Sequence, residues 1–275
     1  MRSVGRLLPR RTVAVRGPGM GIRRLEGIRV LGAFTAVLLI SELLSALTTA
    51  ISGAMLDAVL IPAALAQFTR AEAAPYRRLL PVLALVALIR TLSIAAVVPR
   101  LPQITWYALV GIPLLLGAAL TIRLIDEPLE QLHLRIDQPA LDASLAGLGV
   151  PLGLVGFFLL RPQPPISHPG LLGLIAEEVI LLVTAAFVEE LIFRGLLQAV
   201  VIETYGRQRL GVAYSAGVSA ILYLGSGSIP YTIGVAGLGL LLGALLLRGA
   251  SLWGVTACHG IALVGMATLW PALFG

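Results

Sequence analysis

The stretch "FVEELIFRGLLQ", residues 187–198, places two carboxylates and an arginine inside one of the most apolar parts of the chain. The three charged residues are Glu189, Glu190 and Arg194. A charge near the centre of a lipid bilayer costs about 2.5–3.5 kcal/mol on insertion scales, so residues of this kind are candidates for function. The fold and the function therefore both depend on whether this stretch crosses a membrane.

The composition of the whole chain indicates that it does. Of the 275 residues, 58% are hydrophobic and only 12% are charged, whereas about a quarter of the residues of a soluble domain are charged. The single cysteine, Cys258, excludes an internal disulfide and a CxxC metal site. We therefore predict an all-α polytopic membrane protein.

Nine segments approach the length of about 20 apolar residues that a spanning helix needs. The candidate spans are residues 28–50, 52–67, 79–98, 104–125, 144–161, 170–193, 210–225, 230–247 and 250–272. The second span is short and contains Asp57 and Pro62. The sequence thus predicts a bundle of eight or nine transmembrane helices.

The basic residues predict the orientation of this bundle. All 20 are arginines, and eight of them lie before or at the start of the first span. Arginines beside a first span are typical of a cytoplasmic N-terminus, and we prefer this interpretation to nucleic-acid binding. With nine spans, the expected outer loops carry only Arg100 and Arg161, and the expected cytoplasmic loops carry Arg70, Arg77, Arg78, Arg123, Arg135, Arg207, Arg209 and Arg248. We therefore predict a multi-pass protein of the cell membrane that contacts the lipid bilayer and no nucleic acid.

Polar segments divide the chain into four parts. Residues 1–27 form an Arg-rich cytoplasmic segment, and residues 28–125 form a first transmembrane bundle. Residues 126–143 are polar and are expected to lie at the membrane interface. Residues 144–275 form a second bundle, which contains the opening stretch.

Other charges within the predicted spans have simpler interpretations. Glu42, Asp57 and Arg90 all lie in the first bundle, where an ion pair would fix the packing of helices. Glu177 and Glu178 lie in the first turns of the sixth span, where the helix dipole favours acidic residues. We expect both glutamates to lie at the membrane interface.

The opening stretch suggests a different role for its charges. Glu190 and Arg194 are four residues apart, so they share a helix face and can form an ion pair. Glu189 lies about 100° around the helix from Glu190 and is left without that partner. A buried carboxylate without a cation is suited to act as a general base, although a salt bridge with a bystander acid is the structural alternative. His259, in "TACHGIALVG", is a candidate partner or a packing residue.

"EELIFRGLLQ" resembles EExxxR, the first motif of the CPBP intramembrane proteases, the family of the type II CAAX prenyl endopeptidase and of bacteriocin-processing or immunity proteins. The resemblance covers roughly residues 130–275. It implies an endopeptidase that cuts a membrane-embedded or prenylated peptide substrate, with Glu189 activating water and with Glu190 and Arg194 orienting that base. In the family's HxxxN motif, His259 would stabilise the oxyanion.

The chain departs from this pattern at two positions. The family's FxxxH motif aligns best with Tyr223 and Gly227, so its histidine is missing, and Leu263 replaces the asparagine of HxxxN. A catalytic zinc ion needs three protein ligands, and only Glu189 and His259 are obvious candidates. We therefore expect no metal or other cofactor.

Three functions stay open on the sequence alone. The first is an active intramembrane endopeptidase. The second is a catalytically degenerate homologue that serves as a scaffold or in bacteriocin tolerance, and the third is a small transporter with a proton relay. A glutamate-based protease predicts that Glu189 and His259 face one another across a cavity in the cytoplasmic half of the bundle. Gly227 is expected to line a gap in that cavity.

Overall fold

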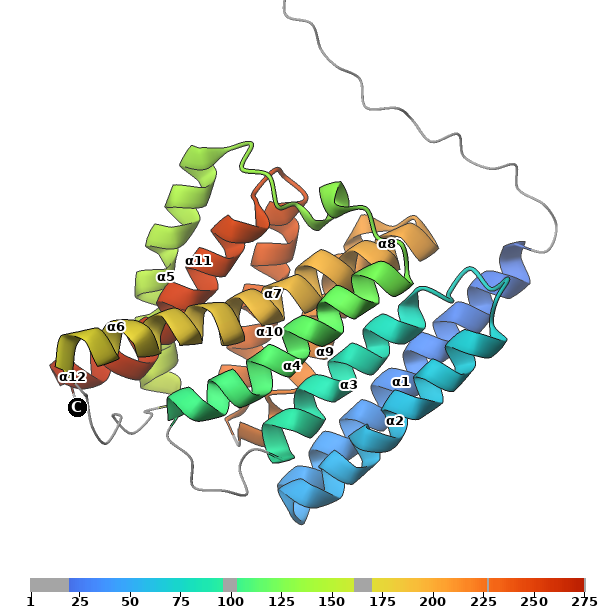
Figure 1. Cartoon of the computed structure of the whole chain (residues 1–275), viewed down its shortest axis with the longest axis horizontal. Coiled ribbons are helices and arrows are strands. Elements are labelled where there is room, and N and C mark those ends of the chain that lie inside the picture. Colours follow the sequence, from blue (N-terminus) through green and yellow to red (C-terminus); the bar gives the residue numbers. More distant parts are fainter. Residues whose placement is uncertain (1–19, 96–102, 161–169, 227, 275) are drawn as a thin grey trace, which may run out of the picture.

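The computed structural model describes residues 20–95, 103–160, 170–226 and 228–274, and within these ranges every regular element is helical. The first half contains α1 (Met20–Leu47), α2 (Ala50–Arg70), α3 (Leu79–Ala95) and α4 (Gln103–Leu124). The second half contains α5 (Pro139–Leu160), a broken helix from α6 to α8, α9 (Gln208–Ile221), α10 (Ile229–Leu246), α11 (Leu252–Val264) and α12 (Trp270–Phe274). These helices form one bundle, with α1 and α2 at one edge and α5, α11 and α12 at the other (Figure 1).

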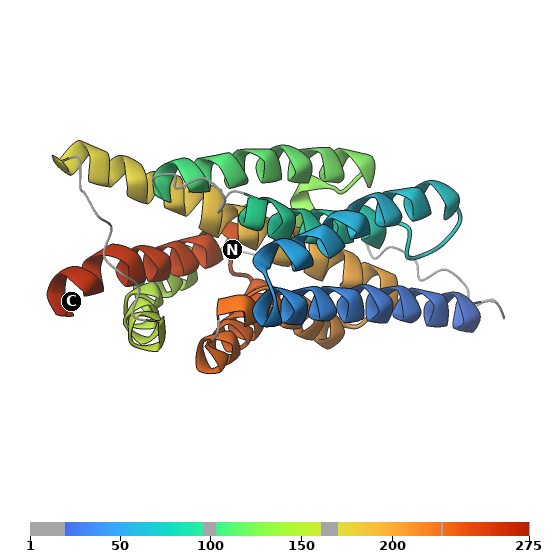
Figure 2. The same ribbon diagram turned by 90° about the horizontal axis from the view of Figure 1, so that it is seen from below.

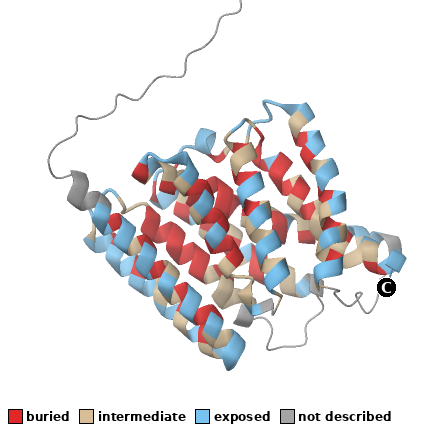
Figure 3. Cartoon of the chain, turned by 180° about the vertical axis from the view of Figure 1, so that it is seen from behind, coloured by how far each residue is buried: buried red, intermediate tan, exposed pale blue. Residues whose placement is uncertain are grey.

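The outer surface of the bundle suits a lipid environment. Within the described residues, six helices are long and apolar enough to cross a membrane, and Leu79–Ser93 is a shorter apolar helix. The six helices are Leu25–Leu47, Ala50–Arg70, Thr105–Leu124, Pro139–Leu160, Ile229–Leu246 and Leu252–Phe274. Their exposed faces carry many large aliphatic side chains, while the buried residues lie between the helices (Figure 3). The prediction of an all-α polytopic membrane protein is confirmed.

Two helices extend beyond the predicted spans. Helix α5 begins at Pro139, inside the predicted interfacial segment, because proline is favourable at the first helical position, where its missing N–H costs nothing. The helix that begins at Gly170 continues past the predicted end at residue 193 to Tyr205. Within this helix, Arg194 is buried and paired with Glu190. The helix ends at Gly206, whose φ of 67° is in the left-handed region that favours glycine.

In the first bundle Glu42 and Asp57 are buried, Arg90 is partly buried, and all three have partners. Arg90 of α3 forms an ion pair with Glu42 of α1, as predicted. Asp57 of α2 instead accepts a hydrogen bond of 2.7 Å from Ser41 Oγ. Charged and polar side chains therefore tie α1 to both α2 and α3.

The four loops that carry the predicted cytoplasmic arginines lie on one face of the bundle. Arg78, just before α3, forms ion pairs with Glu127 in the α4–α5 loop and with Glu203 near the end of α8. Gln138 Nε2, before α5, donates a hydrogen bond of 3.1 Å to the carbonyl oxygen of Arg248 after α10. Figures 1 and 2 show the helices running alternately toward and away from this face. Its location in the cytoplasm stays a prediction.

Candidate active site

The opening stretch lies in a helix whose hydrogen-bonding pattern changes four times. The successive segments are α6 (Gly170–Leu181), a π-helical segment (Leu182–Phe187), α7 (Val188–Glu190), a second π-helical segment (Leu191–Gln198) and α8 (Ala199–Tyr205). π-Helical turns are rare in proteins, and those that occur are often found at functional sites. The short α7 between them carries Glu189 and Glu190, which point to different neighbours.

Glu190 binds two partners, one on its own helix and one on α11. Arg194 Nε lies 3.2 Å from Glu190 Oε2, and His259 Nδ1 lies 2.8 Å from Glu190 Oε1. Glu190 is 1% exposed and Arg194 is 4% exposed, so water does not screen this pair. Gly239 of α10 permits the close packing, because a Cβ atom there would lie 2.9 Å from Arg194 Nη2. The predicted ion pair between Glu190 and Arg194 is confirmed.

Glu189 has a partner that the sequence did not indicate. The hydroxyl of Tyr223, just after α9, lies 3.1 Å from each carboxylate oxygen of Glu189. One hydroxyl therefore contacts both carboxylate oxygens of Glu189. The hydrogen-bond partner of Glu189 is therefore a neutral hydroxyl, whereas Arg194 pairs with Glu190. The sequence feature that could have indicated this contact is Tyr223 itself, which places a hydroxyl where the FxxxH motif has a phenylalanine.

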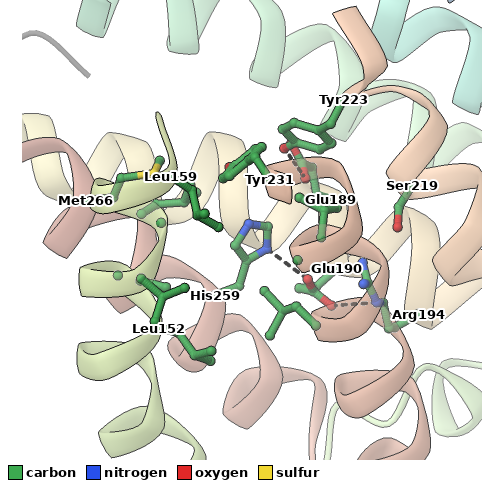
Figure 4. A pocket seen from close by; sticks show the side chains of 18 residues that line it. Leu152, Leu159, Glu189, Glu190, Arg194, Ser219, Tyr223, Tyr231, His259 and Met266 are labelled. Atoms are coloured by element: carbon green, nitrogen blue, oxygen red, sulfur yellow. Dashed lines mark hydrogen bonds and ion pairs between the residues drawn. The ribbon is translucent and has the colours of Figure 1, made fainter. Parts of the chain in front are cut away.

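A cavity of about 100 Å³ lies beside these groups. Glu189 and His259 both line it, together with Tyr231, whose ring packs against Tyr223 with centroids 5.7 Å apart (Figure 4). Leu263 also lines the cavity, so the position of the family's asparagine presents an apolar side chain. The other lining residues are Leu152, Gly153, Val155, Gly156, Leu159, Glu190, Arg194, Ser219, Tyr223, Gly234, Val235, Leu238, Ala262 and Met266.

Gly227, expected to line a gap in this cavity, lies outside the described residues. The structure thus brings together the four residues that the motifs singled out, Glu189, Glu190, Arg194 and His259. Their catalytic roles stay predictions. The Glu189 carboxylate faces Tyr223, and the hydrogen bond of His259 goes to Glu190.

The donor atoms at this site do not fit a catalytic zinc ion. Within the described part of the chain, no group of three His, Cys, Asp or Glu side chains is placed to hold a metal. Both oxygens of Glu190 already have partners, Arg194 and His259. Glu189 and His259 are therefore the remaining ligands, one fewer than the three that a catalytic zinc site uses.

The region around the cavity also matches a known family. Residues 171–264 match the family model described as "Type II CAAX prenyl endopeptidase Rce1-like". The match starts later than the predicted resemblance, which began near residue 130, and it includes all four motif residues. No curated protein and no solved structure matches the chain.

Proposed function

We propose that this chain, whose residues 171–264 match the type II CAAX prenyl endopeptidase Rce1-like family model, acts as a member of that family and hydrolyses a peptide bond of a membrane-embedded or prenylated substrate. The observation that carries this proposal is the position of Glu189. Its carboxylate lies on the cavity wall, is held by Tyr223, and is adjacent to a glutamate that binds both Arg194 and His259. A protein that only needed an ion pair for packing would have no use for this additional acid on the cavity wall.

The proposed reaction uses Glu189 as the general base. The carboxylate takes one proton from a water molecule in the cavity, and the water oxygen attacks the carbonyl carbon of the scissile peptide bond. When the C–N bond breaks, Glu189 returns the proton to the leaving nitrogen. Because the cavity is largely apolar, hydrogen bonds to the developing charges are stronger there than in water.

A second candidate function has its own support. Leu263 lines the cavity where the family has an asparagine, and the sequence has glycine at position 227 where the family has a histidine. A base partner contributes about 10²–10⁴ to the rate, and an oxyanion donor contributes about 10²–10³. A chain without both groups could instead bind a peptide or a prenylated tail without cutting it, as a scaffold or in bacteriocin tolerance.

An assay with the purified chain in liposomes distinguishes hydrolysis from non-catalytic binding. The probe is an internally quenched peptide that ends in a farnesylated cysteine and three further residues. We expect the wild type to cleave this probe, and protein-free liposomes to leave it intact. If the wild type is inactive but Gly227→His cleaves, the non-catalytic function is correct.

Tyr223→Phe is expected to lower kcat/KM by about 10- to 100-fold. The substitution removes the hydroxyl that contacts the Glu189 carboxylate, and a hydrogen bond to a charged group contributes about 1.5–3 kcal/mol. Tyr214→Phe is the matched control, because Tyr214 is also part-buried but donates toward the carbonyl oxygen of Leu31, on α1. A Tyr223→Phe protein with the wild-type rate would show that the hydroxyl does not act on the base.

A further inference from the structure

The two partners of Glu190 determine where the proton on His259 lies. The Arg194 guanidinium stays charged at all ordinary pH values, so its contact with Oε2 favours an ionised Glu190. An ionised carboxylate only accepts hydrogen bonds. The hydrogen between Glu190 Oε1 and His259 Nδ1, which are 2.8 Å apart, therefore belongs to the histidine.

This tautomer leaves a lone pair on the other ring nitrogen. In a neutral imidazole one nitrogen donates and the other accepts, so a proton on Nδ1 makes Nε2 an acceptor. Nδ1 points to Glu190, and the rest of the ring lies beside the cavity (Figure 4). A carboxylate that holds the imidazole through Nδ1 and leaves Nε2 free is the arrangement by which serine proteases orient their histidine base.

We propose that Glu190 holds His259 as the Nδ1–H tautomer and that His259 Nε2 is the second acceptor for the nucleophilic water, opposite Glu189. This inference rests on the proposed function. It gives His259 a different role from the one that its motif implies, since an oxyanion donor needs an N–H at that place. Glu189 and His259 line the same cavity.

The role also accounts for the missing histidine of the second motif. A water with its two hydrogens directed at the Glu189 carboxylate and at Nε2 is fixed and polarised without another imidazole. As its oxygen attacks the carbonyl carbon, one proton passes to Glu189, and the second O–H stays hydrogen-bonded to Nε2. The C–N bond then breaks, the nitrogen takes the proton from Glu189, and the second proton leaves with the new carboxyl group. Tyr231 on the cavity wall remains to donate to the oxyanion.

The tautomer can be observed directly in the full chain. We would label the histidines with ¹⁵N, embed the chain in lipid nanodiscs and record the ring-nitrogen NMR signals near neutral pH. The chain has three histidines, and the signals that disappear in His259→Gln identify this one. We expect a protonated Nδ1 and an unprotonated Nε2. A proton on Nε2, in either the neutral or the charged ring, at a pH where the probe is cleaved would overturn the proposal.

The pH dependence of cleavage tests the acceptor role independently. The groups that face His259 are Glu189, Glu190 and Arg194 on the broken helix, and Tyr223 and Tyr231 around α10. Protonation of Nε2 removes the acceptor, so we expect cleavage of the farnesylated peptide to fall as the pH drops through the titration of His259. His259→Gln should lower kcat by about 10²–10⁴-fold and remove this part of the pH profile.

His133→Gln, which changes a histidine in the α4–α5 loop, is the control and should keep both the rate and the profile. A rate that falls instead as His259 loses its proton would mean that the imidazolium donates to the oxyanion, and the proposal would be wrong. An Nδ1–H tautomer in a wild type that does not cleave would support the role of Glu190 and overturn the proposed function. Cleavage with an Nε2–H tautomer would overturn this inference and leave the proposed function intact.

Discussion

Glu189→Gln is expected to lower kcat by about 10²–10⁴-fold, the range that a positioned general base contributes. Glutamine has nearly the shape of glutamate and can still accept the hydrogen bond from Tyr223, but it cannot take a proton from water. The rate should therefore fall without loss of the fold. The measurement is cleavage of the farnesylated, internally quenched peptide by equal amounts of folded wild type and variant in liposomes.

The matched control for this experiment is Glu178→Gln. Glu178 lies on the same broken helix, but it accepts a hydrogen bond from Thr268 and is not among the residues that line the cavity. We expect its substitution to leave the rate near that of the wild type. If Glu189→Gln keeps full activity, Glu189 is not the base and the proposed mechanism is wrong.

Arg194→Met is expected to lower the free energy of unfolding by about 3–5 kcal/mol, the cost of removing one partner from a buried ion pair. Glu190 would remain almost fully buried, with His259 as its remaining partner. Most of the cost comes from the carboxylate that is left without its cation. The measurement is denaturant unfolding of the detergent-solubilised chain.

Two further variants separate this effect from a general loss of packing. In Glu190→Gln/Arg194→Met no buried charge is left unpaired, so we expect the double variant to be more stable than Arg194→Met alone. Arg209→Met changes an exposed arginine at the loop face, where ion pairs contribute about 0–1 kcal/mol. Equal losses for Arg209→Met and Arg194→Met would contradict the special role of the buried pair.

The membrane fold could be predicted because it depends on composition and on local spacing. Runs of apolar residues identified the helices, and the distribution of arginines matched the loops that lie together on one face. The pair of Glu190 and Arg194 followed from the four-residue spacing on a helix. His259 entered the candidate site through its motif, and it lines the same cavity as Glu189.

The ends of the helices were less predictable, because the local sequence pattern competes with the packing of the helices. The apolar pattern ended the sixth predicted span at residue 193, just before Arg194. In the folded chain this arginine is neutralised inside the bundle, and the helix runs on to Tyr205. The polar segment before α5 was likewise expected to extend to residue 143, but its last residues already form the first turn of that helix.

The sequence by itself determined that this protein is a helical membrane bundle with Glu189, Glu190, Arg194 and His259 as candidate catalytic residues. Only the tertiary structure decided the partners of Glu189 and His259. Tyr223 and Glu189 are 34 residues apart, and His259 and Glu190 are 69 residues apart, so no helical period relates them. Their contacts depend on how α9, α10 and α11 pack around the π-helical turns, because helix packing sets the directions in which buried side chains meet.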